Sequence, residues 1–436
     1  MRHTFAAVDS DVRLLESDQA DGEPVAPTAP VEEQPAARGR LDALRDRLNA
    51  TVDPWRSRLG IGDVEGAALG VWLLSRVPMG LITWAVVWTG FSYTSKLPHG
   101  WASVWQRWDW LRYVAIAEHG YSLRTRHGAS IAFFPGYPAL LYAVHIVLRS
   151  WVYSGLAISF VCGAIACIAL SRIIAMEAEA AGLSPDGVRT AARDGMTLFV
   201  WAPAAVFMAA GYTEAPFLAC ALWAWIAARK GHWLLTGALL AAASIIHING
   251  LFILAGVGIL FLQSRPRGVR GWLRGWPLVL PAVPVAGYMV YLHHLTGNWN
   301  AWEHAESSGW NRHLSYPWHT LAETWYYAFG RYLVAENAWE YQLELVITFI
   351  GIALVLWLAY KRRWPEFVYV GLSVGTLATS HVYLSVNREM LSWWPLWAML
   401  GVWCVRKPWF KTVYLTFAAP VMFAIAYMFL SGKWAG

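Results

Sequence analysis

The stretch Trp101-Ala-Ser-Val-Trp-Gln-Arg-Trp-Asp-Trp-Leu-Arg-Tyr113 follows the first long apolar run of the chain. At helical spacing, Trp101, Trp105 and Trp108 fall at i, i+4 and i+7, on one face of a helix. Indole rings gather at membrane–water boundaries, so the pattern predicts a helix that lies in the interface. Asp109 then lies just outside the hydrocarbon, where a carboxylate costs far less free energy than at the bilayer centre.

Asp109 has two interpretations on local grounds. It can form an exposed ion pair with Arg112 or Arg107, as oppositely charged residues on one helix commonly do. It can also act as a general base, because a carboxylate within hydrogen-bond reach of a sugar hydroxyl takes its proton as that oxygen attacks. At the membrane edge such a base meets both a lipid-borne and a water-borne substrate.

The composition is that of an integral membrane protein. The chain has 436 residues, of which 57% are hydrophobic and 14% charged, whereas a soluble domain carries about 25% charged residues. Its 29 Trp fit aromatic belts at two membrane interfaces. The four Cys lie inside apolar runs, without the spacing of a disulfide framework or a metal site. The net charge of +6 forms no basic stripe with interleaved aromatics, so we expect no nucleic-acid partner.

Residues 1–60 differ in composition from the rest of the chain. They are acidic and rich in Pro and Ala up to Glu33, and basic from Arg38 to Arg58. Low hydrophobicity predicts disorder for the first part, and the apolar region of a signal peptide is missing. Basic residues beside the first span indicate the cytoplasmic side. We therefore expect a disordered cytoplasmic tail with a basic juxtamembrane segment, followed by a transmembrane catalytic domain over residues 61–436.

The apolar runs predict an all-α integral membrane protein with about 11 transmembrane helices. The first run, near residues 64–91, delivers residues 92–130 to the outside, and residues 196–212 form a further run. Arg residues between positions 265 and 274 mark the cytoplasmic side, and residues 293–340 form a second large outside loop. We expect a multi-pass protein, of the plasma membrane if bacterial, with an extracytoplasmic active site.

Two parts of the topology stay open. Residues 131–148 can cross the membrane or re-enter on one side, and residues 233–262 can form one tilted helix or two helices broken at Asn249-Gly250. If residues 233–262 form two helices and residues 131–148 re-enter on one side, Tyr212-Thr-Glu214 lies on the opposite side of the membrane from where simple alternation places it. The sequence does not decide between these arrangements.

Polar side chains inside or beside apolar runs mark candidate functional residues. Arg388 lies at the outer end of a predicted span. Its guanidinium can hold a phosphate through two hydrogen bonds, pair with Glu389, or snorkel to the interface. Glu214, His247 and Asn249 interrupt apolar runs, where they can either line a site or hydrogen-bond neighbouring helices.

The second outside loop contributes Trp310 and Arg312, which can contact either substrate. His residues are frequent in both loops but lack the spacing of metal ligands, so the sequence predicts no metal site and leaves an auxiliary divalent cation open. No Gly-rich phosphate loop is present, which argues against a nucleotide donor.

A series of short motifs runs in order over about residues 64–400. The motifs are Arg107-Trp-Asp-Trp-Leu-Arg-Tyr113, Ile116-Ala-Glu-His-Gly-Tyr121, Phe133-Phe-Pro-Gly-Tyr-Pro138, Ala202-Pro-Ala-Ala-Val-Phe207, Tyr212-Thr-Glu214, His247-Ile-Asn-Gly-Leu251, Glu306 to Arg312, Asn387-Arg388 and Trp394-Pro-Leu-Trp397. In this order the chain resembles the PIG-V-type mannosyltransferases of the GT-C class of membrane glycosyltransferases. It departs from their pattern where His247 stands for Arg, Glu306 for Gln, and Arg388-Glu-Met390 for Arg-Tyr-Leu.

The resemblance implies a GT-C fold, with interfacial helices in the first extracytoplasmic loop. It implies a polyprenyl- or dolichyl-phosphate-mannose donor, inversion at the anomeric carbon, and Asp109 as the catalytic base, the role of the family's first-loop aspartate. The acceptor would be a glycolipid, a glycan or a protein. Membrane lipids are expected to surround the transmembrane domain. The residues expected to bind the donor phosphate or the substrates are Arg388, Arg112, His127, Glu214, His247, Asn249, Trp310 and Arg312.

Two other functions fit the same sequence. One is GT-C transfer from another polyprenyl-phosphate sugar, such as arabinose or glucose. The other is transport of a lipid or a sugar. A transporter should place its charged residues near the bilayer midplane, whereas most of those in this chain lie in two outside loops.

Overall fold

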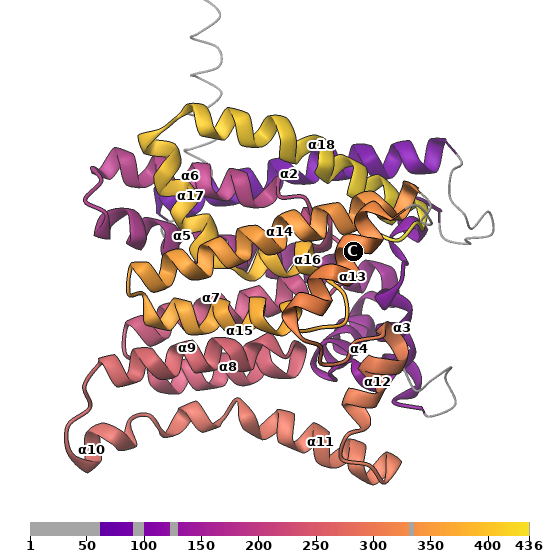
Figure 1. Cartoon of the computed structure of the whole chain (residues 1–436), viewed down its shortest axis with the longest axis horizontal. Coiled ribbons are helices and arrows are strands. Elements are labelled where there is room, and N and C mark those ends of the chain that lie inside the picture. Colours follow the sequence, from indigo (N-terminus) through magenta and orange to yellow (C-terminus); the bar gives the residue numbers. More distant parts are fainter. Residues whose placement is uncertain (1–61, 90–99, 123–129, 331–334, 436) are drawn as a thin grey trace, which may run out of the picture. The chain divides into compact units, whose positions relative to one another are not determined.

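The computed structural model describes residues 62–89, 100–122, 130–330 and 335–435. The tail expected at residues 1–60 and the candidate His127 lie outside the described residues. The described ranges are helical and contain no strand, as the all-α prediction requires (Figure 1).

The helices of the first half are α2 (Asp63–Trp88), η1 (Gly100–Trp105), α3 (Asp109–His119), α4 (Gly136–Leu148), α5 (Trp151–Ala180), α6 (Pro185–Val200), η3 (Ala205–Met208), α7 (Glu214–Arg229) and α8 (Trp233–Ile246). Those of the second half are α9 (Asn249–Gln263), α10 (Gly268–Leu273), η4 (Trp276–Val279), α11 (Ala282–Thr296), α12 (Ala301–Trp310), α13 (Pro317–Phe329), α14 (Ala335–Tyr360), α15 (Trp364–Ala378), α16 (Val386–Glu389), η5 (Met390–Ser392), α17 (Trp394–Arg406) and α18 (Trp409–Ser431).

Several helices have the length and composition of membrane spans. Within the described residues, five segments qualify: Asp63–Trp88, Trp151–Ala180, Trp276–Thr296, Ala338–Tyr360 and Trp409–Ser431. Shorter apolar helices accompany them. The chain is therefore a helical membrane protein, and the larger count of about 11 spans stays a prediction.

The aromatic stretch at Trp101 does not form the single interfacial helix that its spacing predicts. A 3₁₀ helix ends at Trp105, and Trp108 has a positive φ of 50°, which breaks the run before α3 begins at Asp109. As a result the three indoles do not share one face: Trp101 and Trp108 are 53% and 44% exposed, and Trp105 is 5% exposed. The prediction of one aromatic face is wrong because a helical pattern cannot report a backbone break.

The apolar run at residues 196–212 also differs from the prediction. Its first part belongs to α6, which already begins at Pro185, and its remainder is irregular apart from the short η3. Ser184 caps α6 by accepting a hydrogen bond from the Gly187 amide at 3.2 Å. The polar residues from Asp186 to Asp194 therefore lie on the first turns of this helix.

The run at residues 233–262 is two helices. His247 is extended, with φ −149° and ψ 138°, and ends α8 before α9 starts at Asn249. Gly250 allows the tight return, because a Cβ there would lie 2.5 Å from the Ser244 amide nitrogen. This turn brings His247 and Asn249 to one end of the helices.

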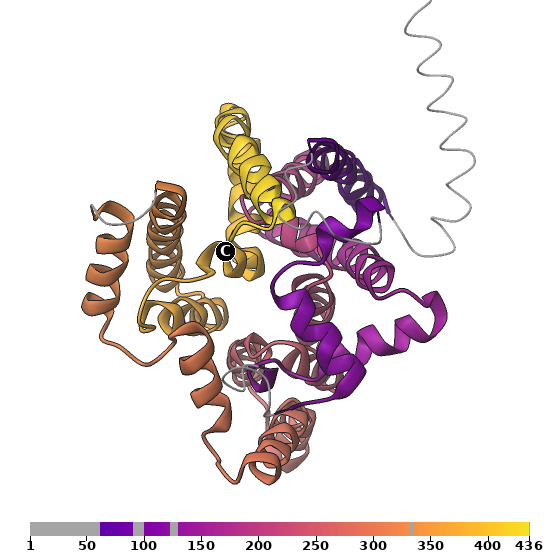
Figure 2. The same cartoon turned by 90° about the vertical axis from the view of Figure 1, so that its right-hand side faces the viewer.

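The short elements gather at that same end. Figure 1 shows α3, α12, α13 and α16 together on one side, and the basic helix α10 on the opposite side. Figure 2 looks onto the end with the short elements, and several of the longer helices are seen there nearly along their axes. Fully buried Trp side chains fill the spaces between the helices: Trp72, Trp225, Trp393, Trp394 and Trp397.

Candidate active site

The position of Asp109 is set by the residue that follows it. Trp110 is 2% exposed, and its indole lies against two backbone positions that lack side chains, Gly155 of α5 and Gly211. A Cβ at either glycine would collide with this ring. Trp110 thus anchors the first turn of α3, and Asp109, as the first residue of that helix, gains from the partial positive charge of the helix amino end.

Arg388 belongs to the short helix α16, whose entry is fixed by a buried acid. Ser385 before it has a positive φ of 64°. The Glu344 carboxylate, from α14, accepts hydrogen bonds from the amides of Val386 at 2.7 Å and Asn387 at 3.2 Å. Glu344 therefore caps the turn that carries Arg388.

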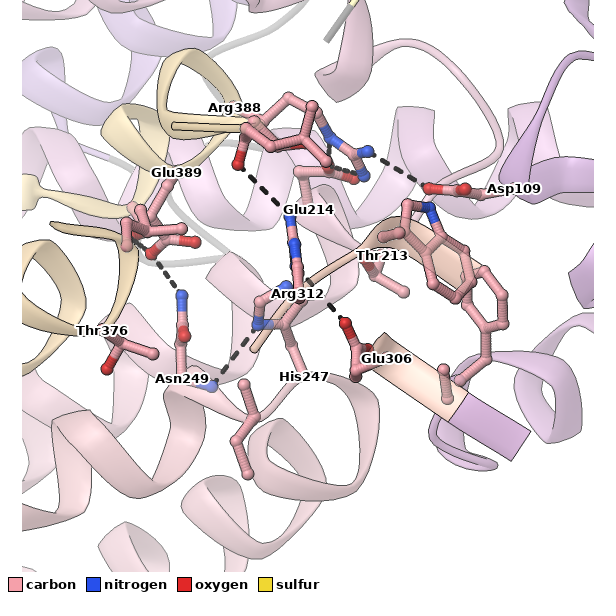
Figure 3. A pocket seen from close by; sticks show the side chains of 18 of the residues that line it. Asp109, Thr213, Glu214, His247, Asn249, Glu306, Arg312, Thr376, Arg388 and Glu389 are labelled. Atoms are coloured by element: carbon pink, nitrogen blue, oxygen red, sulfur yellow. Dashed lines mark hydrogen bonds and ion pairs between the residues drawn. The ribbon is translucent and has the colours of Figure 1, made fainter. Parts of the chain in front are cut away.

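Arg388 connects two carboxylates in the cavity (Figure 3). Its Nη1 lies 3.1 Å from Asp109 Oδ2, its Nε 2.8 Å from Glu214 Oε1, and its Nη2 2.6 Å from the same Glu214 oxygen. The guanidinium also lies over the rings of Phe207 and Tyr212, at 4.5 and 5.1 Å from their centroids. Asp109 is thus paired across the fold, and Arg388 pairs with Asp109 and Glu214 instead of Glu389.

Arg107, one of the local partners considered for Asp109, has a structural role. Its Nε donates to the carbonyl of Val104 at 3.1 Å, and its Nη2 donates to the carbonyl of Leu430, at the end of α18, at 2.8 Å. Its own carbonyl accepts a hydrogen bond from the Tyr212 hydroxyl at 2.9 Å. These contacts tie the turn before Asp109 to two distant segments of the chain.

Asp109, Glu214 and Arg388 line a cavity of about 450 Å³. Of the candidate residues, its walls contain Asp109, Glu214, His247, Asn249, Trp310, Arg312 and Arg388. Arg112 is not among the lining residues of the described chain, although it is only three positions from Asp109 on α3. The expectation that Arg112 contacts substrate therefore has no support in this cavity.

Other lining residues were not predicted as site residues. Glu303 and Glu306 of α12, Glu389 of α16 and Ser373 of α15 line the same cavity. Glu306 and Glu389 carried a usable signal, because each stands at a departure from the family pattern. Ser373 carried none, since a single Ser in an apolar run is commonly a helix-packing residue.

One wall of the cavity holds a second ion pair. Arg312 Nη1 lies 3.7 Å from Glu306 Oε2, and Arg312 Nη2 donates to the Leu384 carbonyl at 3.2 Å. Burial raises the pKa of Glu306, and the nearby Arg312 opposes that rise. Arg312 thereby joins the second loop to the segment that leads into α16.

Another wall is formed by His247, Asn249 and Glu389. The Asn249 amide N–H donates to His247 Nδ1 at 3.4 Å, and the Asn249 side-chain Nδ2 donates to Glu389 Oε1. Burial lowers the pKa of His247 to about 3, with the positive charges of Arg388 and Arg312 as further causes. This imidazole is therefore neutral near pH 7.

A metal ion needs a group of ligating side chains in the candidate site. Among the described residues, no group of three or more His, Cys, Asp or Glu side chains could hold a metal ion. Carboxylates, two Arg side chains and a neutral His surround the cavity. Such groups can take a proton from a bound hydroxyl group and can hold an anion in a fixed orientation.

The fold and cavity define the class first: a helical membrane protein with a cavity at one end that charged and polar side chains line. A sequence model of the mannosyltransferase (PIG-V) family matches residues 92–264. This confirms the resemblance to PIG-V-type mannosyltransferases, and the match supports a glycosyltransferase. The matched segment contains Asp109, Glu214, His247 and Asn249, whereas Arg388 lies beyond it.

Curated relatives point the same way. The chain is 33% identical over 164 residues to the GPI alpha-1,6-mannosyltransferase 2 of Cricetulus griseus. The aligned segment covers 37% of this chain and 32% of that protein. It is 34% identical over 167 residues to the Mus musculus protein of the same name, with the same coverage of 37% and 32%. The chain thus matches about a third of the length of these relatives.

Proposed function

We propose that this chain is a mannosyltransferase that uses a polyprenyl-phosphate-mannose donor and inverts the anomeric carbon in one displacement. The observation that supports it best is Asp109, a carboxylate in a cavity that Arg388 connects to Glu214. A base and a cation for the leaving phosphate are the groups that such a displacement needs, and Glu214 holds that cation in place.

Asp109 acts as the general base in this proposal. The acceptor hydroxyl gives its proton to Asp109 while its oxygen forms the new bond to C1 of the sugar. The bond from C1 to the phosphate oxygen breaks, and its electron pair leaves with the lipid phosphate. The hydroxyl becomes acidic as the bond forms, and the carboxylate takes its proton at that stage.

Arg388 takes the charge of the leaving phosphate. In the free protein its guanidinium contacts both carboxylates, which keeps it extended and oriented. A phosphate that binds to Nη1 replaces Asp109 there and releases the carboxylate toward the acceptor. Arg312, which also lines the cavity, is a second cation for the donor phosphate, and Glu214 keeps Arg388 in place throughout.

The active site faces the extracytoplasmic side in this proposal. Arg270 lies on α10 and Arg267 just before it, and α10 is at the opposite end of the helices from α3 and α16 (Figure 1). Basic loops stay on the cytoplasmic side of a membrane. The GT-C arrangement with about 11 crossings fits if α6, α7, α8, α9, α15 and α17, which run alongside the long helices in Figure 1, also cross.

A transfer assay tests the function directly. The full chain in lipid nanodiscs is incubated with radiolabelled polyprenyl-phosphate-mannose and with glycolipid, glycan and peptide acceptors in turn. Label in an acceptor supports the proposal. Transfer only from the arabinose or glucose donor would make this a different GT-C enzyme, and movement of donor across a sealed vesicle without any product would indicate a transporter.

A further inference from the structure

Glu389 and Arg388 are neighbours in the chain, but their side chains point to opposite walls of the cavity (Figure 3). Arg388 reaches Asp109 and Glu214, the groups that carry the proposed chemistry. Glu389 reaches Asn249 instead. The short helix α16 therefore divides the cavity into a charged wall and a second polar wall.

The Glu389 carboxylate is held by three donors from different elements. Ser373 Oγ of α15 donates to Glu389 Oε1 at 3.0 Å, Ser392 Oγ of η5 donates to it at 2.7 Å, and Asn249 Nδ2 of α9 donates to the same oxygen. Three donors on one oxygen fix the orientation of the group. Glu389 also lines the cavity, so its other oxygen, Oε2, is the one that can accept a hydrogen bond from a ligand.

His247 completes this wall. Its Nδ1 accepts the Asn249 amide N–H, so the proton of the neutral imidazole is on Nε2. Both His247 and Glu389 line the cavity. Glu389 Oε2 is thus a fixed hydrogen-bond acceptor and His247 Nε2–H a fixed donor, and Asn249 contacts both residues. The hydroxyl groups of a sugar ring both donate and accept hydrogen bonds, so they can bind to such a pair.

His247 and Glu389 meet at a single residue, because Asn249 hydrogen-bonds to each of them. His247 lies between α8 and α9, whereas Glu389 belongs to α16. Packing between segments far apart in the chain therefore fixes the two groups relative to each other.

We propose that Glu389 Oε2 and His247 Nε2–H form a hydroxyl-binding subsite for a sugar ring, and that this subsite sets which sugar the cavity accepts. The inference rests on the proposed function and deepens it. The ring belongs either to the mannosyl group of the donor or to the acceptor glycan, which share this chemistry. A buried acceptor built for a hydroxyl rejects an analogue without it, because the protein group is then left unpaired.

The test uses Glu389→Gln in the full chain, with initial rates measured while donor and acceptor are varied separately. Glu118→Gln is the matched control, since Glu118 is exposed on α3 and does not line the cavity in the described chain. We expect KM to rise at least about tenfold for the substrate whose ring binds, with kcat changed far less. A rise for the donor assigns the subsite to the mannosyl group, and a rise for the acceptor assigns it to the acceptor sugar.

Deoxy analogues keep the test decisive if the variant is less stable. With the wild-type protein, one donor or acceptor that lacks a single hydroxyl should lose at least about tenfold in kcat/KM. The same analogue should lose little more with Glu389→Gln, because the missing contact cannot be lost twice. The proposed subsite would be wrong if every analogue lost the same factor in kcat/KM with both proteins. It would also be wrong if a stable Glu389→Gln protein had unchanged KM values.

A binding measurement separates this inference from the proposed function. Trp302 and Trp310 line the cavity, so their fluorescence reports on occupancy by polyprenyl-phosphate-mannose or by the acceptor glycan without any turnover. If wild-type protein transfers nothing but binds one of the two at least about tenfold more tightly than Glu389→Gln does, the function fails and the subsite stands. If transfer occurs and both ligands bind equally to both proteins, the subsite fails and the function stands.

Discussion

Asp109 Oδ2 lies 3.1 Å from Arg388 Nη1, although 279 positions separate the two residues in the chain. Arg388 is shared between Asp109 and Glu214, and all three side chains are less than one fifth exposed. Charges held this far from water are stable only as a group, because removal of one member leaves another without its partner. The group therefore links the proposed chemistry to the packing of α3, α7 and α16.

Replacement of Asp109 by Asn should abolish most of the transfer while the protein stays folded. Asn keeps the shape of the side chain and removes its basicity, so kcat should fall by about 100-fold or more. Product formation in nanodiscs measures this, and thermal unfolding verifies the fold. Near wild-type transfer by a folded Asp109→Asn protein would exclude Asp109 as the base.

Replacement of Arg388 by Met should destabilise the fold as well as abolish activity. It leaves Glu214 buried beside Asp109 without their common cation, and loss of one partner of a buried pair costs about 3–5 kcal/mol. Addition of Glu214→Gln should restore part of the unfolding temperature without restoring activity. If the two substitutions were additive in thermal unfolding, the contact between Arg388 and Glu214 would have no energetic weight.

Replacement of Glu344 by Gln should lower both stability and kcat. One carboxyl oxygen of Glu344 accepts hydrogen bonds from both the Val386 and Asn387 amides, and an amide side chain, which carries a donor in place of one oxygen, caps this turn less well. We expect a loss of about 1–2 kcal/mol, and Arg388 loses its fixed entry. Glu340→Gln is the matched control on the same helix, because neither carboxylate oxygen of Glu340 has a hydrogen-bond partner in the described chain. Equal effects of the two variants would remove Glu344 from this positioning role.

Replacement of Gly155 by Ala should impair catalysis from outside the cavity. The added Cβ collides with the Trp110 ring, so α3 must shift and carry Asp109 with it. Such overpacking typically costs about 1–3 kcal/mol, and we expect kcat to fall more than KM changes. Gly70→Ala, on an open face of α2, is the control, since nothing lies within 4 Å of its added Cβ. A Gly155→Ala enzyme with normal kcat would show that Trp110 does not position the base.

His247 should make the protein less stable in mild acid. Burial lowers its pKa to about 3 in the folded protein, whereas the unfolded chain keeps the ordinary value of about 6.5. The neutral folded form thus contributes its full stability above about pH 6.5, and this contribution is lost as the pH falls toward 3. At pH 5.5, about one unit below the pKa of the unfolded chain, the loss is about 1.4 kcal/mol.

The variant His247→Gln has no such group to titrate. Its unfolding temperature should therefore fall less than that of the wild type between pH 7 and pH 5.5. Parallel decreases in the two proteins would mean that His247 is protonated in the folded state. Thermal unfolding in nanodiscs at both pH values provides the comparison.

Local patterns in the sequence predicted the helical membrane class, and most of the candidate residues that they marked line the cavity. Apolar runs reveal helices that can cross a bilayer because length and hydropathy are properties of one segment. Polar residues that interrupt such runs, among them Glu214 and Asn249, are costly unless they serve a site, so they could be found before any fold was known. Asp109 was a candidate because the aromatic pattern placed it at the membrane edge, and Arg388 because it lies at the outer end of a predicted span.

Only the tertiary structure decided which of these residues meet. The connection of Asp109 to Glu214 through Arg388, and of Glu389 to His247 through Asn249, depends on packing between helices far apart in the chain. The backbone break at Trp108 and the absence of Arg112 from the cavity wall depend on it too. A sequence pattern reports which face of its own segment a residue occupies, whereas an ion pair requires two faces from separate segments to be brought together.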